Sequence, residues 1–390
     1  MDYDVIVIGG GIHGAGVLQA AVAKGYSALL LEQFDSAAQG TSSRSSKLIH
    51  GGLRYLEHGE FKLVYECLKE RKILLRNAPS LVKLKPFYIP VYESSTRNAS
   101  IIRTGLFIYS LLTGFNRKTR FSSIPKSEWG SLTGLKQTGL TAVFKYADAQ
   151  TDDAALTRTV IESAQSLGAK VQWNAKFMSA ERKGSGYSVH YENTSSGATI
   201  QIKAHAIVNA GGPWVNAIAK YIQPRVDTAD VDLVQGAHIF LPGDTQGNIF
   251  YLEAPQDRRA VFVMPWKDHL MIGTTEKLYQ GDPTNPQPSE EEINYLLEVY
   301  NHYFPGSATR DDIIGSFAGV RVLPKDSANP FKRTRETIYA YDNKQEPGYV
   351  AIYGGKLTSY RATAENVIKK LSPHLPRRVK KTDTERLSLT

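Results

Sequence analysis

Three glycines near the N-terminus have the spacing that binds the phosphates of a dinucleotide. Gly9, Gly11 and Gly14 form a GxGxxG pattern directly after the apolar run of residues 5–8. The first glycine permits a tight turn, the second lets the backbone approach a pyrophosphate, and the third lets a helix over residues 14–24 pack against the strand. The N–H groups at the start of that helix would then face the anion.

A carboxylate follows this turn at the separation expected for a ribose contact. Residues 28–31 are a second apolar run, and it ends at Glu32, roughly 20 residues after the glycines. A carboxylate there accepts hydrogen bonds from the hydroxyls of an adenosine ribose. A glycine turn without a ligand is the alternative, but strand, spacing, helix and acid together favour a dinucleotide site.

Glycine-rich turns recur far apart in the chain, at residues 9–14, 51–52, 210–212 and 354–355. An NAD site usually completes its contacts within one contiguous domain, whereas FAD is long enough to be wrapped by distant segments. We therefore predict FAD. Residues 355–358, at the start of a helix, would place N–H donors and a positive dipole end against the flavin, which stabilises the charge it gains on reduction.

These segments need a framework of strands and helices to bring them together. Residues 40–56 are too polar and glycine-rich for a core element, so we expect a loop lying on the ligand. Ser289 and Glu292 form a capping box that begins a helix. Periodicity predicts helices over 60–76, 101–115, 289–304 and 356–370, and a further helix that is capped by Asp152 or Asp153. It also predicts strands near 84–92, within 231–275, near 313–321 and over 349–353. Three more strands, near 170–174, 187–192 and 199–203, are expected to form an antiparallel meander.

Length and composition fit two globular domains. The chain has 390 residues, of which 42% are hydrophobic and 22% charged. Its single cysteine, Cys67, excludes a disulfide framework, an iron–sulfur cluster and a cysteine-based zinc site, and no metal is expected. Cys67 lies on a predicted amphipathic helix, where we expect it to be inert. There is no signal-peptide pattern and no spanning apolar run, so we expect a cytoplasmic protein.

The net charge of +9 calls for an explanation. No nucleic-acid-binding module is recognisable, so an anionic small substrate, an anionic membrane surface or solubility explains the charge better. The apolar segment 101–115 has Arg103, Arg117, Lys118 and Arg120 on its flanks. This helix either packs in the core or docks on the inner face of the cytoplasmic membrane, because apolar helices with basic edges bind anionic lipid.

Several motifs resemble those of the FAD-dependent glycerol-3-phosphate dehydrogenases and oxidases, within the D-amino-acid-oxidase-like flavoproteins. They are GGGIHGAG (9–16), TSSRSSKLIHGGLRYLEHGEF (41–61), NAGGPWV (209–215), QGAHI (235–239), VFVMPW (261–266), IGTTE (272–276), GVRVL (319–323) and YGGKLTSYR (353–361). The run SSKLIHGGLRYL is the most discriminating. Many members continue into a helical domain, whereas this chain stops at Thr390, where that domain would begin, either as a natural short form or as a truncated piece.

The resemblance implies an α/β (α+β) fold with a Rossmann-like FAD-binding domain and an inserted substrate domain on a mixed or antiparallel sheet. We expect residues 1–84, 145–228 and 335–390 to form the FAD-binding domain and residues 85–144 and 229–334 the substrate-binding domain. A homodimer is one arrangement that we allow for.

The resemblance also implies oxidation of glycerol 3-phosphate, or a similar anionic substrate, by hydride transfer to the flavin. Arginines and a tyrosine would hold the phosphate: Arg54, Arg321, Arg335 and Tyr55. His238 is the expected general base, and Arg321 or Lys356 would steady the developing carbonyl or the reduced ring. The cofactor contacts implied are Gly9, Gly11, Gly14, Glu32, Thr41, Ser42, Ser46, Lys47, His50, Gly51, Gly52, Phe177, Ala210, Gly211, Gly355, Lys356, Leu357 and Thr358.

Some of these roles have plain structural alternatives. A histidine within an alternating strand, such as His238, is often a satisfied structural residue. Arg54 alone could be a surface charge, and Arg335 lies in a basic cluster that could simply be solvated. His50 either packs against the flavin or links to it covalently.

Three functions fit the sequence. The first is a dehydrogenase that passes electrons to membrane quinone. The second is an oxidase that reduces oxygen, or a related flavoenzyme acting on another hydroxy or amino acid. The third is a flavin-binding regulator without turnover.

Overall fold

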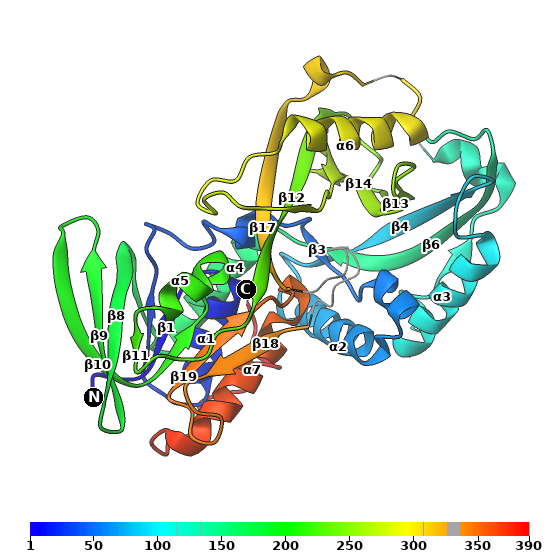
Figure 1. The fold of residues 1–390 in the computed structure, drawn as a ribbon. Coiled ribbons are helices and arrows are strands. Elements are labelled where there is room, and N and C mark those ends of the chain that lie inside the picture. Colours follow the sequence, from blue (N-terminus) through cyan, green and yellow to red (C-terminus); the bar gives the residue numbers. More distant parts are fainter. Residues whose placement is uncertain (115, 133, 307, 326–335, 390) are drawn as a thin grey trace.

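The computed structural model describes residues 1–114, 116–132, 134–306, 308–325 and 336–389. Two β-sheets organise the chain, and Figure 1 shows them as neighbouring parts of one elongated molecule. Each sheet draws strands from distant segments, because the chain crosses between the two sheets repeatedly. The predicted fold class, a Rossmann-like domain combined with a second sheet domain, is confirmed.

The first sheet, sheet A, has a parallel centre. Strands β19, β10, β1, β2 and β7 lie in that order, with β18 antiparallel to β19, and β9, β8 and β11 extend the sheet beyond the N-terminal half of β10. The bounds are β1 (Tyr3–Ile8), β2 (Ala28–Leu31), β7 (Lys170–Gln172), β8 (Ala175–Lys183), β9 (Gly186–Asn193), β10 (Ala198–Asn209), β11 (Ile222–Gln223), β18 (Ile338–Tyr341) and β19 (Tyr349–Tyr353).

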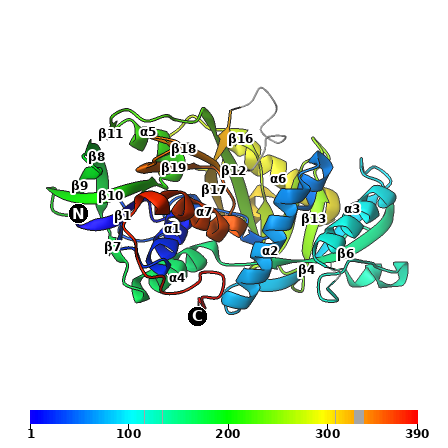
Figure 2. The ribbon, with the colours of Figure 1, turned by 90° about the horizontal axis from the view of Figure 1, so that it is seen from below.

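The strands at the centre of sheet A are apolar where both of their faces are buried, as in residues 5–8 of β1, in β2 and in β19. On β1, Val5 and Val7 pack into one hydrophobic cluster, whereas Ile6 and Ile8 pack into another on the opposite face. The first cluster is covered by α1 (Ile12–Ala23), α4 (Asp153–Ser166) and α7 (Tyr360–Leu371). Figure 2 shows these three helices side by side. The second cluster includes the short helix α5 (Val215–Ala219) and side chains of β8 and β9.

The second sheet, sheet B, is mostly antiparallel, in the order β16, β12, β15, β14, β13, β4, β6, β3, with β17 also paired with β12 and β5 with β6. Its bounds are β3 (Leu48–Ile49), β4 (Lys83–Tyr92), β5 (Ser122–Ser123), β6 (Leu140–Gln150), β12 (Val231–Pro242), β13 (Ile249–Glu253), β14 (Ala260–Trp266), β15 (His269–Gly273), β16 (Lys277–Leu278) and β17 (Gly315–Pro324).

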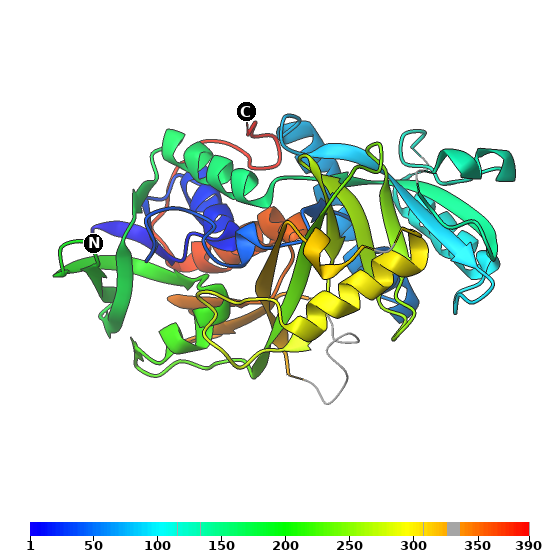
Figure 3. The ribbon, with the colours of Figure 1, turned by 90° about the horizontal axis from the view of Figure 1, so that it is seen from above.

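Helices cover the two faces of sheet B. The helix α6 (Glu290–Tyr303) lies across one face, as seen in Figure 3, and it begins at the predicted capping box of Ser289 and Glu292. The helices α2 (Phe61–Asn77) and α3 (Ala99–Leu112) pack on the other face. One side of α3 buries Leu106 and Tyr109, while Phe107 on its other side is 52% exposed. Core packing therefore accounts for one face of α3 only.

One prediction about strand pairing was wrong. The strand near residues 170–174 is β7, which pairs in parallel with β2 instead of joining the meander. The meander consists of β8, β9 and β10, and β8 has no counterpart among the predicted strands. Its sequence, AKFMSAERK, mixes apolar and charged residues because only Ala175 and Ala180 along it are buried. The signal for β8 was therefore weak.

Candidate functional site

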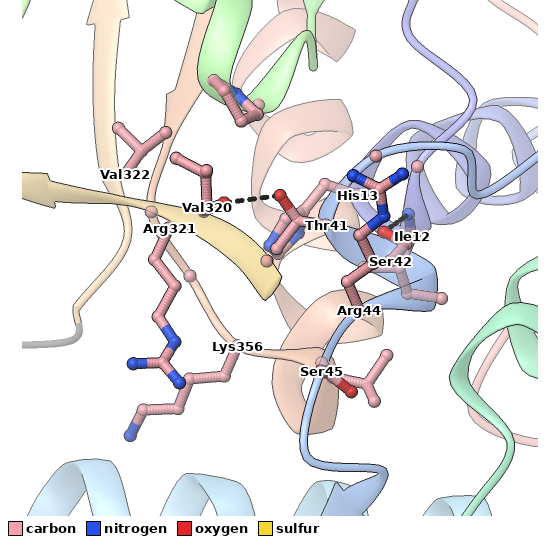
Figure 4. Close-up of a pocket in the computed structure, with 18 of the residues that line it drawn as sticks. Ile12, His13, Thr41, Ser42, Arg44, Ser45, Val320, Arg321, Val322 and Lys356 are labelled. Carbon is pink, nitrogen blue, oxygen red and sulfur yellow. Dashed lines mark hydrogen bonds between the residues drawn. The ribbon is translucent and has the colours of Figure 1, made fainter. Parts of the chain in front are cut away.

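A cavity of about 510 Å³ lies between the two sheets. Sheet A contributes the carboxyl ends of β1, β2 and β10, and sheet B contributes Phe87, Tyr146, Tyr251 and Phe262 to the lining. The carboxyl ends of parallel strands are the usual place for a ligand in such sheets. Figure 4 shows side chains from the dinucleotide turn, the loop after β2, β17 and the segment before α7 converging on the cavity.

The predicted dinucleotide turn forms one end of this cavity. Gly9 has a φ of +106°, and a Cβ atom on Gly14 would lie 1.8 Å from the carbonyl oxygen of Gly9. Both positions therefore need glycine. Gly11 precedes α1 without a side-chain cap, and the first turn of α1 contains no acid. The positive dipole at the start of α1 is thus left for an anion.

Glu32 lines the cavity beside this turn. Its carboxylate accepts hydrogen bonds from the backbone N–H of Gly10 at 2.5 Å and of Phe34 at 3.0 Å. Burial raises the pKa of Glu32, and the backbone donors oppose that shift. Each carboxylate oxygen has more than one lone pair, so ribose hydroxyls can also donate to it.

The serine-rich loop after β2 is fixed at several points. Ser42 Oγ accepts a hydrogen bond from Ile12 N at 2.9 Å, and Thr41 Oγ1 donates to the carbonyl oxygen of Val320 at 2.6 Å (Figure 4). Asp153 accepts hydrogen bonds from Ser45 Oγ at 2.6 Å and from Lys47 Nζ at 2.6 Å. These contacts hold the loop against the turn, as expected for a segment lying on the ligand.

The next part of the loop rests on a buried network. Gly51 N donates to the hydroxyl of Tyr109 at 2.8 Å, and this hydroxyl donates to Asp148 Oδ2 at 2.7 Å. Asp148 also pairs with the buried Arg71. His50 lines the cavity, and Thr358 Oγ1 accepts a hydrogen bond from its backbone N–H at 3.2 Å.

The ionisation of His50 is strongly shifted by this position. Burial is the largest cause and lowers its pKa to about 4, with the cations Lys356, Arg54 and Arg71 acting in the same direction and Asp148 opposing them. The imidazole is therefore neutral at pH 7.

Cationic side chains gather at the far end of the cavity. Arg54, Arg321 and Lys356 all line it, and Figure 4 shows Arg321 and Lys356 apart from Ile12 and His13 at the start of α1. Arg321 Nη1 pairs with Glu276 Oε1 at 3.0 Å, and Lys356 Nζ lies 3.7 Å from the centroid of the Tyr55 ring. The lining there can hold a phosphate or another small anion.

Most predicted site residues line the cavity: Gly9, Gly11, Glu32, Thr41, Ser42, Ser46, His50, Gly52, Arg54, Tyr55, Phe177, Ala210, Gly211, Arg321, Gly355, Lys356, Leu357 and Thr358. Gly14, Lys47, Gly51 and His238 do not reach its surface. Gly14 lets α1 approach Gly9, and Lys47 and Gly51 anchor the loop from behind. Arg335 lies outside the residues that the structure describes.

Other lining residues were not singled out from the sequence. The sequence indicates a helix cap for Asp153 and no more, yet this side chain fixes both Ser45 and Lys47. Thr274 and Glu276 both contact Arg321, and they lie within the motif IGTTE, which could have drawn attention to them. Phe262 lies within the motif VFVMPW, whereas Tyr251 carries no signal beyond strand periodicity.

The cavity fits FAD. The glycine turn, the α1 N-terminus and Glu32 share the lining of this cavity with Thr358 and the cations Arg54, Arg321 and Lys356. A Cβ atom added at Gly11 would lie 3.1 Å from Ser42 Oγ and would narrow the cavity between the turn and the loop. FAD would place its ribose at Glu32, its pyrophosphate at the turn and its flavin near His50 and Lys356, where it would accept a hydride.

Comparisons with known proteins agree with an FAD site in this cavity. A family model described as FAD dependent oxidoreductase matches residues 4–361. Glycerol-3-phosphate dehydrogenase of Pseudomonas aeruginosa is 42% identical over 384 residues, covering 95% of this chain and 72% of that protein. D-erythritol 1-phosphate dehydrogenase of Brucella abortus is 37% identical over 377 residues, covering 96% of this chain and 74% of that protein.

A solved structure extends the likeness to the fold. Glycerol-3-phosphate dehydrogenase from Bacillus halodurans, complexed with FAD, matches with a TM-score of 0.73 and 27% identity, covering 98% of this chain and 69% of that one. The family resemblance and the FAD cofactor expected from the sequence are confirmed. The chain belongs to the family of FAD-dependent oxidoreductases and, within it, is a relative of the glycerol-3-phosphate dehydrogenases.

Proposed function

We propose that this chain oxidises sn-glycerol 3-phosphate to dihydroxyacetone phosphate and delivers the hydride to bound FAD. The observation that carries the proposal is that the lining cations Arg321 and Lys356 lie apart from the start of α1 (Figure 4), while Arg54 and Lys356 both lie over the Tyr55 ring. A dianionic phosphate suits guanidinium groups, which bind it through paired N–H donors. Both sequence relatives described above are named as dehydrogenases of a phosphorylated polyol.

Each residue at that end has a distinct proposed role. Arg54 and Arg321 bind the phosphate, and Tyr55 donates its hydroxyl. Glu276 and Thr274 orient the Arg321 guanidinium, through contacts of 3.0 and 3.3 Å. Lys356, positioned over the Tyr55 ring, stabilises the negative charge that develops during the reaction. When bound, the flavin supplies the hydride acceptor, and His238 takes up the proton of the substrate hydroxyl.

We propose that the cofactor contacts are those predicted from the sequence, with Gly14, Lys47 and Gly51 acting indirectly by shaping the turn and the loop. We propose a division of labour between domains that follows the two sheets. Sheet A and its helices bind FAD, and sheet B with α6 forms the substrate side.

An anaerobic absorbance titration tests the function. Glycerol 3-phosphate should bleach the oxidised-flavin spectrum of the purified protein, whereas glycerol at equal concentration should not, because it lacks the phosphate that the arginines bind. A protein that holds flavin but is bleached by neither compound would contradict the proposal and favour a flavin-binding regulator.

We further propose quinone as the electron acceptor, with oxygen as the alternative that would make the protein an oxidase. Mixing the reduced protein with air and, separately, with a soluble quinone analogue distinguishes the two. Rapid return of the flavin colour with the quinone and slow return with air is the expected result. The opposite order would identify an oxidase.

We also propose that the protein associates peripherally with an anionic membrane. Among the residues that the structure describes, no helix is long and apolar enough to span a bilayer. The helix α3 leaves Ile101, Phe107 and Leu111 each more than half exposed, and the basic segment 117–120 follows it. The wild type should sediment with anionic-lipid vesicles at low salt, and Phe107→Ser should weaken this binding with little change in stability. Failure of the wild type to sediment would exclude the idea.

A further inference from the structure

His238 does not reach the cavity of the proposed reaction. It lies on β12 with 1% of its surface exposed and is absent from the lining. Its ring stacks on Phe317 with centroids 4.7 Å apart and planes 9° from parallel. On the other side, a Cβ atom added to Gly273 would lie only 2.1 Å from His238 Cδ2. The imidazole is held between two strands and has no room to swing into the cavity.

Ser46 occupies the space between His238 and the cavity. Its Oγ atom lies 3.0 Å from His238 Nε2, and Ser46 itself lines the cavity. The residues on either side of it, Ser45 and Lys47, are both tied to Asp153, whose side chain is fully buried. Ser46 is therefore a fixed hydroxyl that faces the cavity and contacts the imidazole.

The surroundings of His238 keep its imidazole neutral. Burial is the main cause that holds the pKa of His238 well below its usual value, and the charges of Arg321 and Lys47 act in the same direction. Its Nδ1 atom is buried and has no hydrogen-bond partner among the described residues. Ser46 is thus the polar contact through which this imidazole can exchange a proton.

We propose that Ser46 and His238 form a proton path, with Ser46 as the group that meets the substrate hydroxyl. This inference rests on the proposed function. As the C–H bond breaks and its electron pair leaves with hydrogen as hydride to the flavin, the substrate hydroxyl passes its proton to Ser46 Oγ. The Ser46 hydroxyl proton passes at the same time to His238 Nε2. The substrate becomes a ketone, and His238 becomes an imidazolium.

A base of low pKa is sufficient for this transfer. Loss of hydride turns the substrate alcohol toward a protonated carbonyl, which is far more acidic than any imidazolium, so the proton moves downhill even to a weak base. The nearby charges of Arg321 and Lys47 then favour rapid release of the proton from His238 when the cofactor is reoxidised.

Substitutions at Ser46 test the path directly. Ser46→Ala should slow anaerobic flavin reduction by glycerol 3-phosphate by about 100-fold or more, the usual contribution of a positioned proton-transfer group. Ser46→Thr keeps a hydroxyl and should restore most of the rate. Ser43→Ala is the matched control, because Ser43 belongs to the same loop but does not line the cavity, and it should reduce at the wild-type rate.

Two results of this series would overturn the path. Reduction of Ser46→Ala at the wild-type rate would show that the hydroxyl carries no proton. Equal slowing in Ser46→Ala and Ser46→Thr, with unchanged FAD affinity, would show that the hydroxyl is not what the reaction needs. If glycerol 3-phosphate failed to reduce the wild type at all, the proposed function would fall first.

A spectroscopic measurement tests the hydrogen bond without turnover. NMR of protein labelled with ¹⁵N-histidine reports the protonation of each ring nitrogen, and the His238 signals are assigned by their loss in His238→Gln. The path requires a neutral His238 ring whose proton is on Nδ1 and whose Nε2 accepts a hydrogen bond from Ser46. Ser46→Ala should shift the Nε2 resonance and leave the other histidines unchanged. A His238 ring that is protonated on Nε2 at pH 7 would contradict the path, whatever the substrate.

Discussion

The two ends of the cavity are built in different ways. The dinucleotide end is formed mainly by backbone: glycines, the start of α1 and the carboxyl ends of parallel strands, with Glu32 as its main charged side chain. The cationic end is formed by long side chains from separate segments, such as Arg54, Arg321 and Lys356, each held by neighbours. A backbone site tolerates no added atoms, whereas a side-chain site depends on partners that orient each charge.

The largest effect should come from adding one methyl group at the dinucleotide end of the cavity, which is formed mainly by backbone. Gly14→Ala would place a Cβ atom 1.8 Å from the Gly9 carbonyl oxygen, so α1 must move away from β1. We expect the purified variant to contain no FAD. Gly105→Ala is the control, because nothing lies within 4 Å of a Cβ atom at Gly105 on α3. It should keep its flavin, and a Gly14→Ala protein that also kept full flavin would refute the backbone account.

Removing a buried charge beneath the loop should be the next largest effect. Asp148→Asn keeps the shape of the side chain but leaves the Arg71 guanidinium buried without its counter-charge. The expected loss is about 3–5 kcal/mol of unfolding free energy, measured by urea denaturation. Glu181→Gln breaks an ion pair whose side chains are about 60% exposed, and it should change stability by less than about 1 kcal/mol. Equal effects of the two substitutions would contradict this prediction.

Truncation at the cationic end should separate substrate binding from cofactor binding. Arg321→Met removes the guanidinium that Glu276 and Thr274 orient, and we expect KM for glycerol 3-phosphate to rise about 100-fold. FAD content should stay at the wild-type level. Arg310→Met, at an exposed ion pair with Glu290, is the control and should leave KM unchanged. Loss of FAD from Arg321→Met would mean that the two ends are not independent.

The smallest effect concerns pH. His50 has a pKa of about 4 in the folded protein and 6.5 as its ordinary value, so the unfolded chain binds more protons between these two values. The cofactor-free protein should therefore lose stability as pH falls from about 6.5 toward 4. His50→Asn should lessen this loss, as seen in urea midpoints measured at pH 7, 6 and 5. An unchanged pH dependence would show that His50 is not buried as described.

The comparison also explains what the sequence could predict. The dinucleotide turn could be predicted because Gly9 to Glu32 is a continuous segment in which strand, turn and helix each follow from the local sequence pattern. The parallel strands β1, β2 and β19 were predictable because burial on both faces makes them largely apolar, whereas the parallel strand β7 is partly exposed and was assigned to the meander. In contrast, β8 buries only Ala175 and Ala180 and has no clear pattern.

The arrangement of side chains at the cationic end depends on contacts between residues that are far apart in the sequence. Nothing in the local pattern around His238 indicates that Phe317 and Gly273 enclose its ring or that Ser46 separates it from the cavity. Likewise, Asp153 looked like a helix cap, and only the folded chain shows that it anchors Ser45 and Lys47. Family motifs could suggest which residues matter there, but not which of them touch the cavity.

A single-turnover experiment tests the central claim most directly. FAD-loaded protein is mixed without oxygen with one equivalent of glycerol 3-phosphate, and flavin bleaching is followed together with the product released on quenching. We predict that dihydroxyacetone phosphate forms in the same molar amount as reduced flavin. Full flavin occupancy with neither bleaching nor product would contradict the claim that this cavity joins a flavin site to a polyol phosphate site.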